Sequence, residues 1–495
     1  MATFCLFNFG CRASYADGVA LRSQLLQAGL QEAARGEPGD LAVLNTCTVT
    51  STADAEVRQV IRRIHRSNAH CQILVTGCYA QRAPEEIAEL PGVTWVVGNS
   101  HKHAVADLVR THFGCDSGRT TGRAPVGDGT RARNGGVETN PRPEFVQIAG
   151  LSGRAQRAQV LVGEISHEFH FTPSLFDGAA HRGADERTRP NLKVQDGCNA
   201  RCSFCVIPHV RGDSRSLPPE RAVEQVREFD RQGYKEVVLS GINLGSYGRD
   251  LDRKITFLGL IEKLLAETSI LRLRISSIEP MDVSAELIRL VARESRLARH
   301  FHVPLQSGSD RILRLMNRRY WTTQYAERLR GIREQIPQCA IGADVMVGFP
   351  GETREDHART LAFLEAMPFT YVHVFPYSLR PNTAAAELPG HVNGRIAHER
   401  GQEVRALVAR KHQAFLNAQI GQTLSVVTLD QTRDSARIAL SSNFLQVVLP
   451  GSEVSPNELL DIHVGRVADG FLYGRVPDFE PHGRTAMPEC VGSKP

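Results

Sequence analysis

The chain has 495 residues, which is too many for one compact core, so we expect roughly two to four domains. Hydrophobic residues make up 41% and charged residues 23%, with a net charge of +5, a composition typical of a soluble globular protein. No apolar run approaches the ~20 residues that would span a bilayer, and "MATFCLFNFGC" at the N-terminus has no basic leader, so we expect a cytoplasmic protein without a membrane partner. In a reducing compartment, eleven cysteines favour metal ligation or catalysis over disulfides.

Residues 1–113 alternate between short apolar runs and helical patterns. The runs are "TFCLFNFGC", "LAVLNTC", "QILVTGC" and "TWVVGN", and amphipathic stretches such as "DAEVRQVIRRIHRSN" lie between them. Strand–helix alternation of this kind predicts an α/β fold, here an N-terminal domain built on a parallel sheet.

Three cysteines of this region stand at equivalent places in the pattern. Cys11, Cys47 and Cys78 are each expected at the last position of a strand. Because the carboxyl ends of parallel strands share one edge of a sheet, the three thiols are predicted to converge. The alternative is that each is simply a buried core residue, since free cysteine is often buried.

Residues 114–188 interrupt the pattern. The segment is rich in Gly, Arg, Thr and Pro and shows no regular periodicity, so we expect a flexible linker. Within it, "AQVLVGEISHEFHF" has the composition of a strand, to which the sequence assigns no role.

Residues 189–415 predict a partial (β/α)6 barrel with a trailing helix. Six strand-like runs, from "NLKVQDGC" to "YVHVFPYS", alternate with helical segments. Such barrels carry their chemistry at the C-terminal strand ends. The β-rich residues 416–478 predict a small C-terminal β-barrel of about five strands, and residues 479–495 are expected to be a disordered tail.

Cys198, Cys202 and Cys205 follow the first strand of this barrel as Cys-x3-Cys-x2-Cys. Zinc ribbons pair one C-x-x-C with a second pair, so this spacing does not fit them, although His209 could complete a zinc site. Iron–sulfur cubanes ordinarily take four cysteine thiolates. Three thiolates would leave one iron open to S-adenosyl-L-methionine, which would explain the missing fourth ligand.

The stretch "CNARCSFC" resembles the radical S-adenosylmethionine (radical SAM) signature, with Phe204 as the aromatic before the third cysteine. With the three N-terminal cysteines and the C-terminal barrel, which resembles the RNA-binding TRAM module, the chain resembles the radical methylthiotransferases up to about residue 478. The stretches "LNTCTVT", "VQDGC", "SSIEP" and "HVPLQSGSDRILRLMNRRY" are most similar to the branch that modifies C2 of N6-threonylcarbamoyladenosine in tRNA, immediately 3′ of the anticodon.

The resemblance implies two 4Fe–4S clusters and S-adenosyl-L-methionine as cofactors. The implied metal ligands are Cys198, Cys202 and Cys205 for the catalytic cluster, and Cys11, Cys47 and Cys78 for an auxiliary one. One S-adenosylmethionine would methylate a sulfur associated with the auxiliary cluster, and a second would give the radical that removes hydrogen from the adenine. The implied partners are tRNA and a flavodoxin- or ferredoxin-like electron donor.

The resemblance and the strand ends also indicate further contacts. Implied cofactor contacts are Phe204, Ser240, Gly241, Glu279, Gln306, Ser307, Gly348 and Glu352. Implied RNA contacts are Arg58, Arg62, Arg63, Arg66, Arg318 and Arg319, because phosphates supply most nonspecific affinity. From residue 420 to 476 there are four arginines against six acidic residues, so the barrel itself is slightly acidic.

This acidic barrel keeps two alternatives open. A related branch methylthiolates an aspartate of a ribosomal protein, and an acidic module would suit a basic protein partner. A noncatalytic zinc- or cluster-bearing RNA-binding protein is the third hypothesis.

Overall fold

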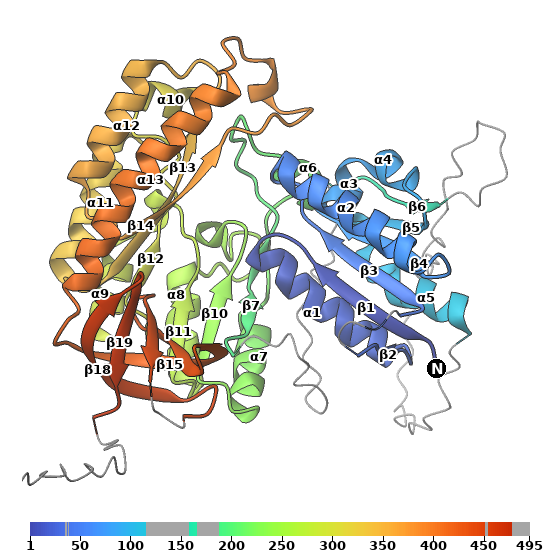
Figure 1. The fold of residues 1–495 in the computed structure, drawn as a ribbon, viewed down its shortest axis with the longest axis horizontal. Helices are drawn as coiled ribbons and strands as arrows, with labels where there is room; N and C mark the ends of the chain where they lie inside the picture. The colour runs from blue at the N-terminus through green and yellow to red at the C-terminus, as the bar shows by residue number, and fades with distance from the viewer. Residues whose placement is uncertain (35–36, 38, 115–157, 166–187, 451–453, 478–495) are drawn as a thin grey trace, which may run out of the picture.

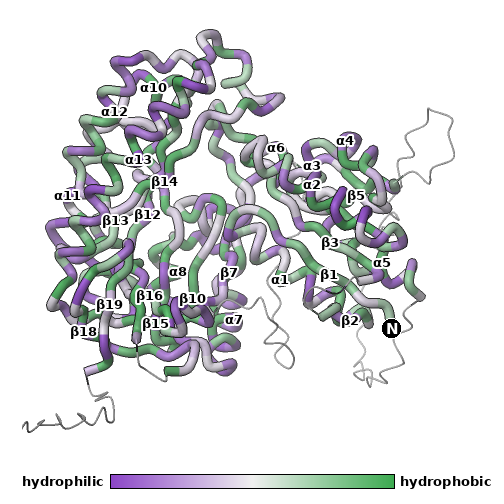
Figure 2. Tube along the Cα trace, viewed as in Figure 1, coloured by the Kyte–Doolittle hydropathy of each residue, from purple (hydrophilic) through white to green (hydrophobic). Residues whose placement is uncertain are grey.

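The computed structural model describes residues 1–34, 37, 39–114, 158–165, 188–450 and 454–477. An N-terminal lobe lies beside a central lobe, and a closed barrel formed by the C-terminal strands packs against the end of the central lobe (Figure 1). Figure 2 shows that the strands of the two lobes are largely hydrophobic, whereas the outer helices mix polar and apolar residues. The expected disordered tail, 479–495, falls outside the described residues.

The N-terminal lobe is a six-stranded parallel sheet, in the order β2-β1-β3-β4-β5-β6. Its strands are β1 (Thr3–Asn8), β2 (Gln31–Glu32), β3 (Leu41–Thr46), β4 (Gln72–Gly77), β5 (Val93–Gly98) and β6 (Gln159–Leu161). Its helices are α1 (Arg12–Gln27), α2 (Ser51–Ser67), α3 (Cys78–Arg82), α4 (Pro84–Ala88), η1 (Asn99–Ala104) and α5 (Val105–Phe113). One buried cluster joins the sheet to α1 and α5, and another joins its opposite face to α2, α3 and α4.

Strand β6 lies inside the segment that the sequence predicts to be a flexible linker. Residues 159–161 pair in parallel with β5, Leu161 is buried, and the Gln81 side chain donates to the Gly163 carbonyl over 2.9 Å. The apolar run "QVL" covers an otherwise open edge strand, which explains why this part of the segment is ordered. The remaining parts, 115–157 and 166–187, lie outside the described residues.

The central lobe contains six parallel strands in the predicted order. They are β7 (Asn191–Lys193), β10 (Glu236–Ser240), β11 (Arg272–Ile275), β12 (His300–His302), β13 (Ala340–Val347) and β14 (Tyr371–Pro376). Two three-stranded sheets, β11-β10-β7 and β12-β13-β14, are linked by isolated parallel bridges, such as Ser277 with His302. β14 ends the series without pairing to β7, so the barrel is partial, as predicted.

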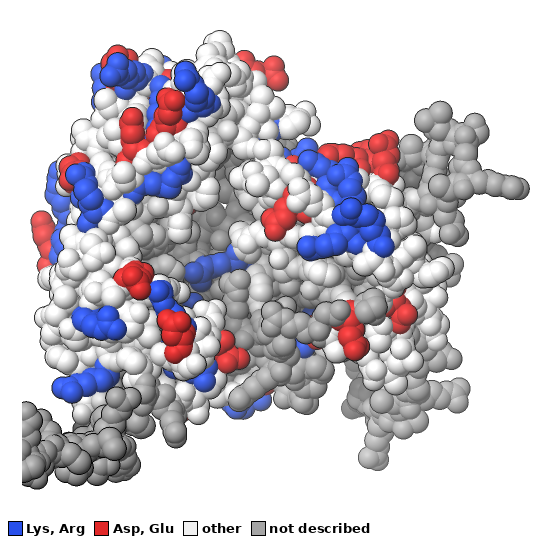
Figure 3. Space-filling view, in the orientation of Figure 1, with Lys and Arg blue, Asp and Glu red and all other residues white. Residues whose placement is uncertain are grey.

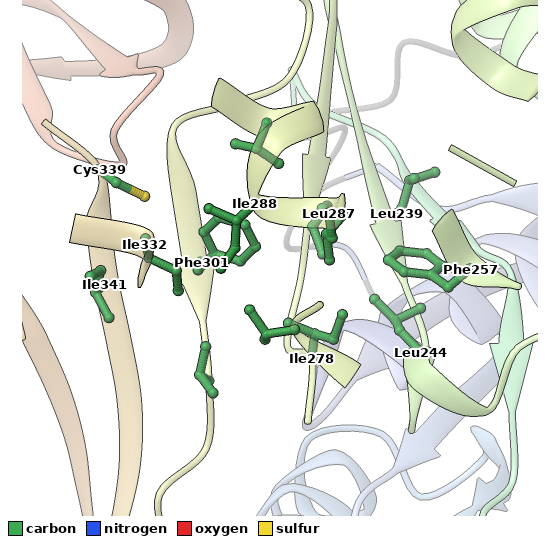
Figure 4. Close-up of a cluster of buried hydrophobic side chains, with 14 of the residues drawn as sticks. Leu239, Leu244, Phe257, Ile278, Leu287, Ile288, Phe301, Ile332, Cys339 and Ile341 are labelled. Carbon is green, nitrogen blue, oxygen red and sulfur yellow. The ribbon is translucent and has the colours of Figure 1, made fainter. Parts of the chain in front are cut away.

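Helices cover the outside of this partial barrel. They are α7 (Pro219–Arg231), α8 (Phe257–Glu267), α9 (Ala285–Arg293), α10 (Asp310–Leu315), α11 (Thr322–Gln335), α12 (Arg354–Ala366) and α13 (Gly394–Asn417). Figure 4 shows side chains such as Phe257, Leu287 and Ile332 packed against the strand residues Leu239, Phe301 and Ile341. No helix in the described ranges is both long and apolar enough to cross a bilayer.

The C-terminal strands close into a barrel in the order β15-β16-β17-β19-β18. The strands are β15 (Thr423–Arg433), β16 (Ala436–Ser441), β17 (Gln446–Leu449), β18 (Leu459–Ala468) and β19 (Phe471–Arg475). Together, the parallel sheet, the partial barrel and the five-stranded closed barrel confirm the predicted mixed α/β fold class.

Glu236 fastens this barrel to the central lobe. Its carboxylate is fully buried and binds Arg189, Arg272 and Arg274. Arg272 then donates to the Ser425 hydroxyl over 2.6 Å, and Arg274 donates to the Ser441 carbonyl over 3.0 Å. Burial alone would raise the pKa of Glu236, but the three guanidinium groups outweigh it and lower the pKa to about 2.

Replacing Glu236 by glutamine is expected to destabilise the protein by about 3–5 kcal/mol, because three buried arginines lose their common anion. A carboxyl whose pKa falls from 4.5 to about 2 on folding adds roughly 3 kcal/mol of stability above pH 4.5, and this contribution is lost as the pH falls toward 2. Chemical denaturation between pH 7 and pH 3 measures both effects. A Glu236→Gln variant whose stability falls with acid as steeply as the wild type would contradict this account.

Candidate functional site

The loop of Cys198, Cys202 and Cys205 begins at the end of the first barrel strand. It follows β8 (Gln195–Asp196), which pairs with β9 (Arg215–Ser216). Gly197 has φ +66°, and a side chain there would lie 1.9 Å from the Asp213 carbonyl oxygen, so only glycine allows this turn. The Cys198 amide donates to the Gly212 carbonyl over 3.0 Å, which fixes the start of the loop.

The middle of the same loop, at Ser203, is held by residues that follow β12 and β14. The Ser203 amide donates to the Met316 carbonyl over 3.1 Å, and its hydroxyl donates to the Leu315 carbonyl over 2.8 Å. The Ala385 amide donates to the Ser203 carbonyl over 2.7 Å. The loop conformation is therefore set by backbone contacts from segments far apart in the sequence.

The three thiols of this loop share one environment. Burial raises the pKa of Cys198, and it raises that of Cys205 to about 12, with Cys202 and Cys198 adding to the effect. Donors nevertheless lie beside the sulfurs: the Ala200 amide is 3.4 Å from the Cys198 Sγ, and Arg318 Nη1 is 3.2 Å from the Cys202 Sγ. These donors would stabilise thiolates once a metal has displaced the protons.

The N-terminal cysteines lie just beyond the strand ends, not in the last strand positions as predicted. Cys11 caps the start of α1, Cys47 follows β3 directly, and Cys78 begins α3. A side chain at Gly10 would lie 2.7 Å from the Cys47 Sγ, so glycine lets the first strand–helix turn pass against that thiol. The strands end one to three residues earlier because the chain turns there into the helices.

The three thiols follow the carboxyl ends of β1, β3 and β4, which are neighbours in the sheet, so they lie at one sheet edge. Burial raises the pKa of Cys47 to about 12, with smaller contributions from Cys78 and Cys11. Polar partners surround them: the Ser14 hydroxyl lies 3.7 Å from Cys11 Sγ, and the Asn99 amide donates to Cys78 Sγ over 3.5 Å.

The residue types of the two triads suit an iron–sulfur cluster, because cysteine thiolates are its usual ligands. Among the described residues, no group of three His, Cys, Asp or Glu side chains is arranged to hold a single metal ion. All six cysteines of the triads are free thiols, as cluster ligation requires.

A short helix, α6 (Ile207–Arg211), connects the two triads. It starts two residues after Cys205, and its neighbour Val206 packs with Val210 in one buried cluster that also contains Cys78. Asn99 donates both to Cys78 and, over 2.7 Å, to the Val210 carbonyl. The lobe boundary therefore brings Cys78 of the N-terminal triad close to Val206, the residue after Cys205 of the central triad.

A buried ionic network crosses this boundary beneath the N-terminal triad. Asp17 of α1 binds Lys193 and Arg211 of the central lobe, as well as Lys102 of its own lobe. Asp196 binds the same Lys193 and Arg211, each over 2.9 Å. Burial would raise the pKa of Asp17, but the three cations outweigh it and hold the pKa well below its usual range.

A second buried ionic contact joins the two lobes near the N-terminal triad. Asp54 of α2 accepts from Arg380 of the central lobe over 2.6 Å, and from Arg82 over 3.0 Å. Arg82 also donates to the hydroxyl of Thr48, the residue after Cys47, over 2.7 Å. Sequence patterns did not reveal either ionic group, since the partners come from distant segments.

Glu279 and Arg318 stand together beside the central triad. Arg318 binds both the Glu279 carboxylate and the Cys202 Sγ, and its side chain is only 6% exposed. Burial raises the pKa of Glu279, which Arg318 opposes. The sequence predicts that Arg318 contacts RNA; in the structure its guanidinium is directed inward, where it pairs with Glu279 and Cys202, so an RNA contact by this side chain stays a prediction.

Several implied cofactor contacts are engaged by the protein itself. The Ser240 hydroxyl donates to the Leu192 carbonyl. The Ser307 hydroxyl accepts from the Ser309 amide over 3.2 Å and lies 3.4 Å from the Thr360 hydroxyl. Glu352 is buried, accepts from the Gly348 amide and pairs with Arg400, so both residues hold α13 against the barrel. These side chains have structural partners that the sequence did not predict.

The other three implied contacts lie near the mouth of the barrel. Phe204 packs edge-on against Phe349, with ring centroids 6.5 Å apart. Gln306 has φ +67° and bridges to Val345, which turns the chain at the end of β12. The backbone of Gly241 passes close to Gln195.

The arginines of α2 form an exposed basic surface. Arg62, Arg63 and Arg66 are exposed, and Figure 3 shows basic atoms gathered over this helix. Arg58 differs, because it donates to the Tyr79 hydroxyl over 2.7 Å and pairs with Glu86. Arg319 is exposed, unlike its neighbour Arg318.

Comparison with known proteins follows the same division of the chain. Residues 3–98 match a family model described as uncharacterized protein family UPF0004, and residues 192–364 match the radical SAM superfamily. The chain is 31% identical over 469 residues to threonylcarbamoyladenosine tRNA methylthiotransferase MtaB of Bacillus subtilis, covering 94% of each chain. It is 34% identical to the protein of the same name from Aquifex aeolicus, covering 90% of this chain and 96% of the relative.

Two further similarities concern a different substrate and the fold. A tRNA-2-methylthio-N(6)-dimethylallyladenosine synthase of Pelotomaculum thermopropionicum is 30% identical, with 86% of each chain covered. Among solved structures, the radical S-adenosylmethionine methyltransferase TsrM from Kitasatospora setae matches with a TM-score of 0.53 at 16% identity, covering 78% of this chain and 75% of that one. The last similarity shows a shared fold.

Proposed function

The chain belongs to the radical SAM tRNA methylthiotransferases, and from this we propose that it adds a methylthio group to C2 of N6-threonylcarbamoyladenosine at the position 3′ of the tRNA anticodon. It is therefore a transferase that uses S-adenosylmethionine and a 4Fe–4S cluster. We further propose a second 4Fe–4S cluster, and reduction by a flavodoxin- or ferredoxin-like donor.

The observation that carries this proposal is the meeting of two cysteine triads at one lobe boundary. Val206, next to Cys205, and Cys78 share a buried cluster, so groups held by both triads would face one substrate. Cys198, Cys202 and Cys205 would hold the catalytic cluster, and Cys11, Cys47 and Cys78 the auxiliary one. Each set offers three thiolates, which leaves one iron open on each cluster.

The chemistry supplied by the bound groups is reductive cleavage of S-adenosylmethionine at the central triad and a methylated sulfur at the N-terminal one. The protein positions the bound groups relative to the substrate and controls the polarity and solvent access around them. Arg318 orients Glu279 and shields the Cys202 thiolate. The hydrogen bonds of Ser203 fix the conformation of the loop that carries the central triad. The ionic contacts of Asp17 and Asp54 hold the lobes at a set separation.

The exposed arginines of α2 suit a tRNA substrate. Within the described part of the chain, Arg62, Arg63 and Arg66 are exposed and form no ion pair with an acidic side chain, and guanidinium groups bind phosphates well. The anionic backbone of tRNA would be drawn to this surface, which belongs to the lobe that carries the N-terminal triad. The slightly acidic C-terminal barrel is not needed for this electrostatic attraction.

A second candidate substrate is N6-dimethylallyladenosine, favoured by the 30% identity to the synthase from Pelotomaculum thermopropionicum.

Nucleoside mass analysis tests the proposed function. Total tRNA from a strain lacking the gene is digested and compared with tRNA from the same strain carrying the wild-type gene. We expect the methylthio derivative of threonylcarbamoyladenosine to appear only with the gene. If the dimethylallyl derivative appears in its place, the second candidate is correct, and if neither appears, tRNA is not the substrate.

Arg318→Gln is expected to abolish most reductive cleavage of S-adenosylmethionine, because a buried carboxylate and a cysteine ligand lose their shared cation. Arg319→Gln removes an exposed guanidinium from the next position and should leave cleavage unchanged. Formation of 5′-deoxyadenosine in the absence of tRNA measures the effect. Equal cleavage by the two variants would show that Arg318 has no role at the central triad.

A further inference from the structure

On the last two barrel strands, β13 and β14, the side chains that point to the interior of the barrel are partly exposed, whereas those of β13 that point outward are buried. In β13, Ala343, Val345 and Val347 are buried in the core under the helices, whereas Asp344 and Met346 are partly exposed. Side chains alternate across a strand, so Asp344 and Met346 point to the interior of the barrel. An apolar exterior and an accessible interior are expected where a barrel encloses a ligand.

Three aromatic side chains of β14 lie beside these positions. The parallel register pairs Gly342 with Tyr371, Asp344 with His373 and Met346 with Phe375. We call Tyr371, His373 and Phe375 the aromatic row.

The rings of the aromatic row form a continuous surface. The ring centroids of Tyr371 and His373 are 5.3 Å apart, and those of His373 and Phe375 are 6.4 Å apart. A side chain at Gly342 would lie 2.0 Å from the Tyr371 ring, so this glycine lets the ring lie across β13. The row is accessible, since His373 is exposed and Phe375 retains 42% of its surface.

His302 and Asp344 supply hydrogen-bonding groups next to the row. The His302 Nε2 atom lies 3.2 Å from the Asp344 carboxylate, and its Nδ1 atom lies 3.1 Å from the Tyr371 hydroxyl. The His302 and His373 rings are 5.6 Å apart. Aromatic rings on which a base could stack therefore lie next to polar groups that could bind the edge of that base. Proteins that recognise unpaired bases use this combination.

The row also lies beside the loop of the central triad. Met346, which pairs with Phe375, is in the same apolar cluster as Phe204, the residue before Cys205. β14 borders the space toward the N-terminal lobe in Figure 1, and the molecular surface is hollowed there in Figure 3.

We propose that the aromatic row is the platform on which the target adenine of tRNA stacks, with the partly exposed carboxylate of Asp344, which His302 holds, facing its edge. This inference rests on the proposed function and names the residues that would hold its substrate. A base on the row would lie beside the loop of the central triad, and the exposed ring of Phe375 is open to stacking.

The test uses the full-length, reconstituted protein and an anticodon stem-loop RNA with 2-aminopurine at the target position. Stacking on an aromatic ring quenches the fluorescence of this base. The wild type and Phe375→Tyr are expected to quench it, whereas Phe375→Ala should not, and its affinity for the RNA should fall roughly 5- to 150-fold, the loss that corresponds to one stacked base. Trp321→Ala removes an equally exposed aromatic, 42%, from outside the row and should behave as the wild type.

Equal quenching by the wild type and Phe375→Ala would overturn the inference, as would an equal loss in Trp321→Ala. Iron content and the midpoint of thermal unfolding should be unchanged in all variants, which separates a binding defect from a folding defect. The nucleoside analysis judges the proposed function separately. Normal tRNA modification with undiminished quenching by Phe375→Ala would overturn this inference alone, and a wild type that neither binds nor modifies tRNA would overturn both.

Discussion

Replacing Cys47 by alanine is expected to abolish methylthio transfer while leaving reductive cleavage of S-adenosylmethionine intact. Cys47 is buried and belongs to the N-terminal lobe, whereas Cys198, Cys202 and Cys205 belong to the central lobe, so its loss should affect only the auxiliary cluster. Iron should fall from about eight to about four per chain, because each cubane contains four irons. Anaerobic assays of 5′-deoxyadenosine and of the methylthio nucleoside measure the two activities on one sample.

The matched variant is Cys202→Ala in the central triad. It should lose both activities, because no radical forms without the catalytic cluster, although about four irons should remain on the N-terminal triad. At the same iron content of about four per chain, Cys47→Ala should therefore cleave S-adenosylmethionine and Cys202→Ala should not. Loss of cleavage in Cys47→Ala would show that the triads do not act as separate sites.

Asp17→Asn is expected to uncouple the two activities without removing either cluster. Its carboxylate joins Lys193 and Arg211 across the lobe boundary, and Arg211 ends the helix that separates the triads. Removing one partner of a buried ionic group costs about 3–5 kcal/mol and leaves cations that repel across the boundary. We expect normal cleavage of S-adenosylmethionine, near-normal iron, and a loss of methylthio product per cleavage event of up to about 100-fold, the effect that a 1 Å misplacement can have.

Glu236→Gln is the control for Asp17→Asn, since it also removes a buried carboxylate with three cationic partners. It lies at the junction with the C-terminal barrel, so it should lose stability and keep the ratio of product to cleavage. The same ratio in both variants would mean that Asp17 contributes stability alone.

The sequence was sufficient to predict the architecture because its periodicity is local. Runs such as "LAVLNTC" and "QILVTGC" alternate with amphipathic helices, and the parallel sheet and partial barrel follow from that alternation. The convergence of Cys11, Cys47 and Cys78 followed from the same reasoning, since strand ends of a parallel sheet share an edge. The error of one to three residues in their placement reflects the low precision with which periodicity marks the end of a strand.

Contacts between distant charges were beyond sequence reasoning. Asp17 and Lys193 are 176 positions apart, and nothing in either local pattern links them. Arg318 and Arg319 are adjacent and identical in type, yet one is buried against Glu279 and the other is exposed. For the interior face of the barrel a signal did exist: "HFHV", "IGADV" and "YVHV" carry polar residues at alternate positions of otherwise apolar strands.

The central claim is that two cysteine triads, one in each lobe, each hold a four-iron cluster. Iron analysis of the anaerobically reconstituted protein with Cys198, Cys202 and Cys205 all replaced by alanine tests it most directly. About four irons per chain should remain, with the absorption of a 4Fe–4S cluster, and this iron should disappear when Cys47 is replaced as well. A protein that binds no iron once the central triad is removed would contradict the account.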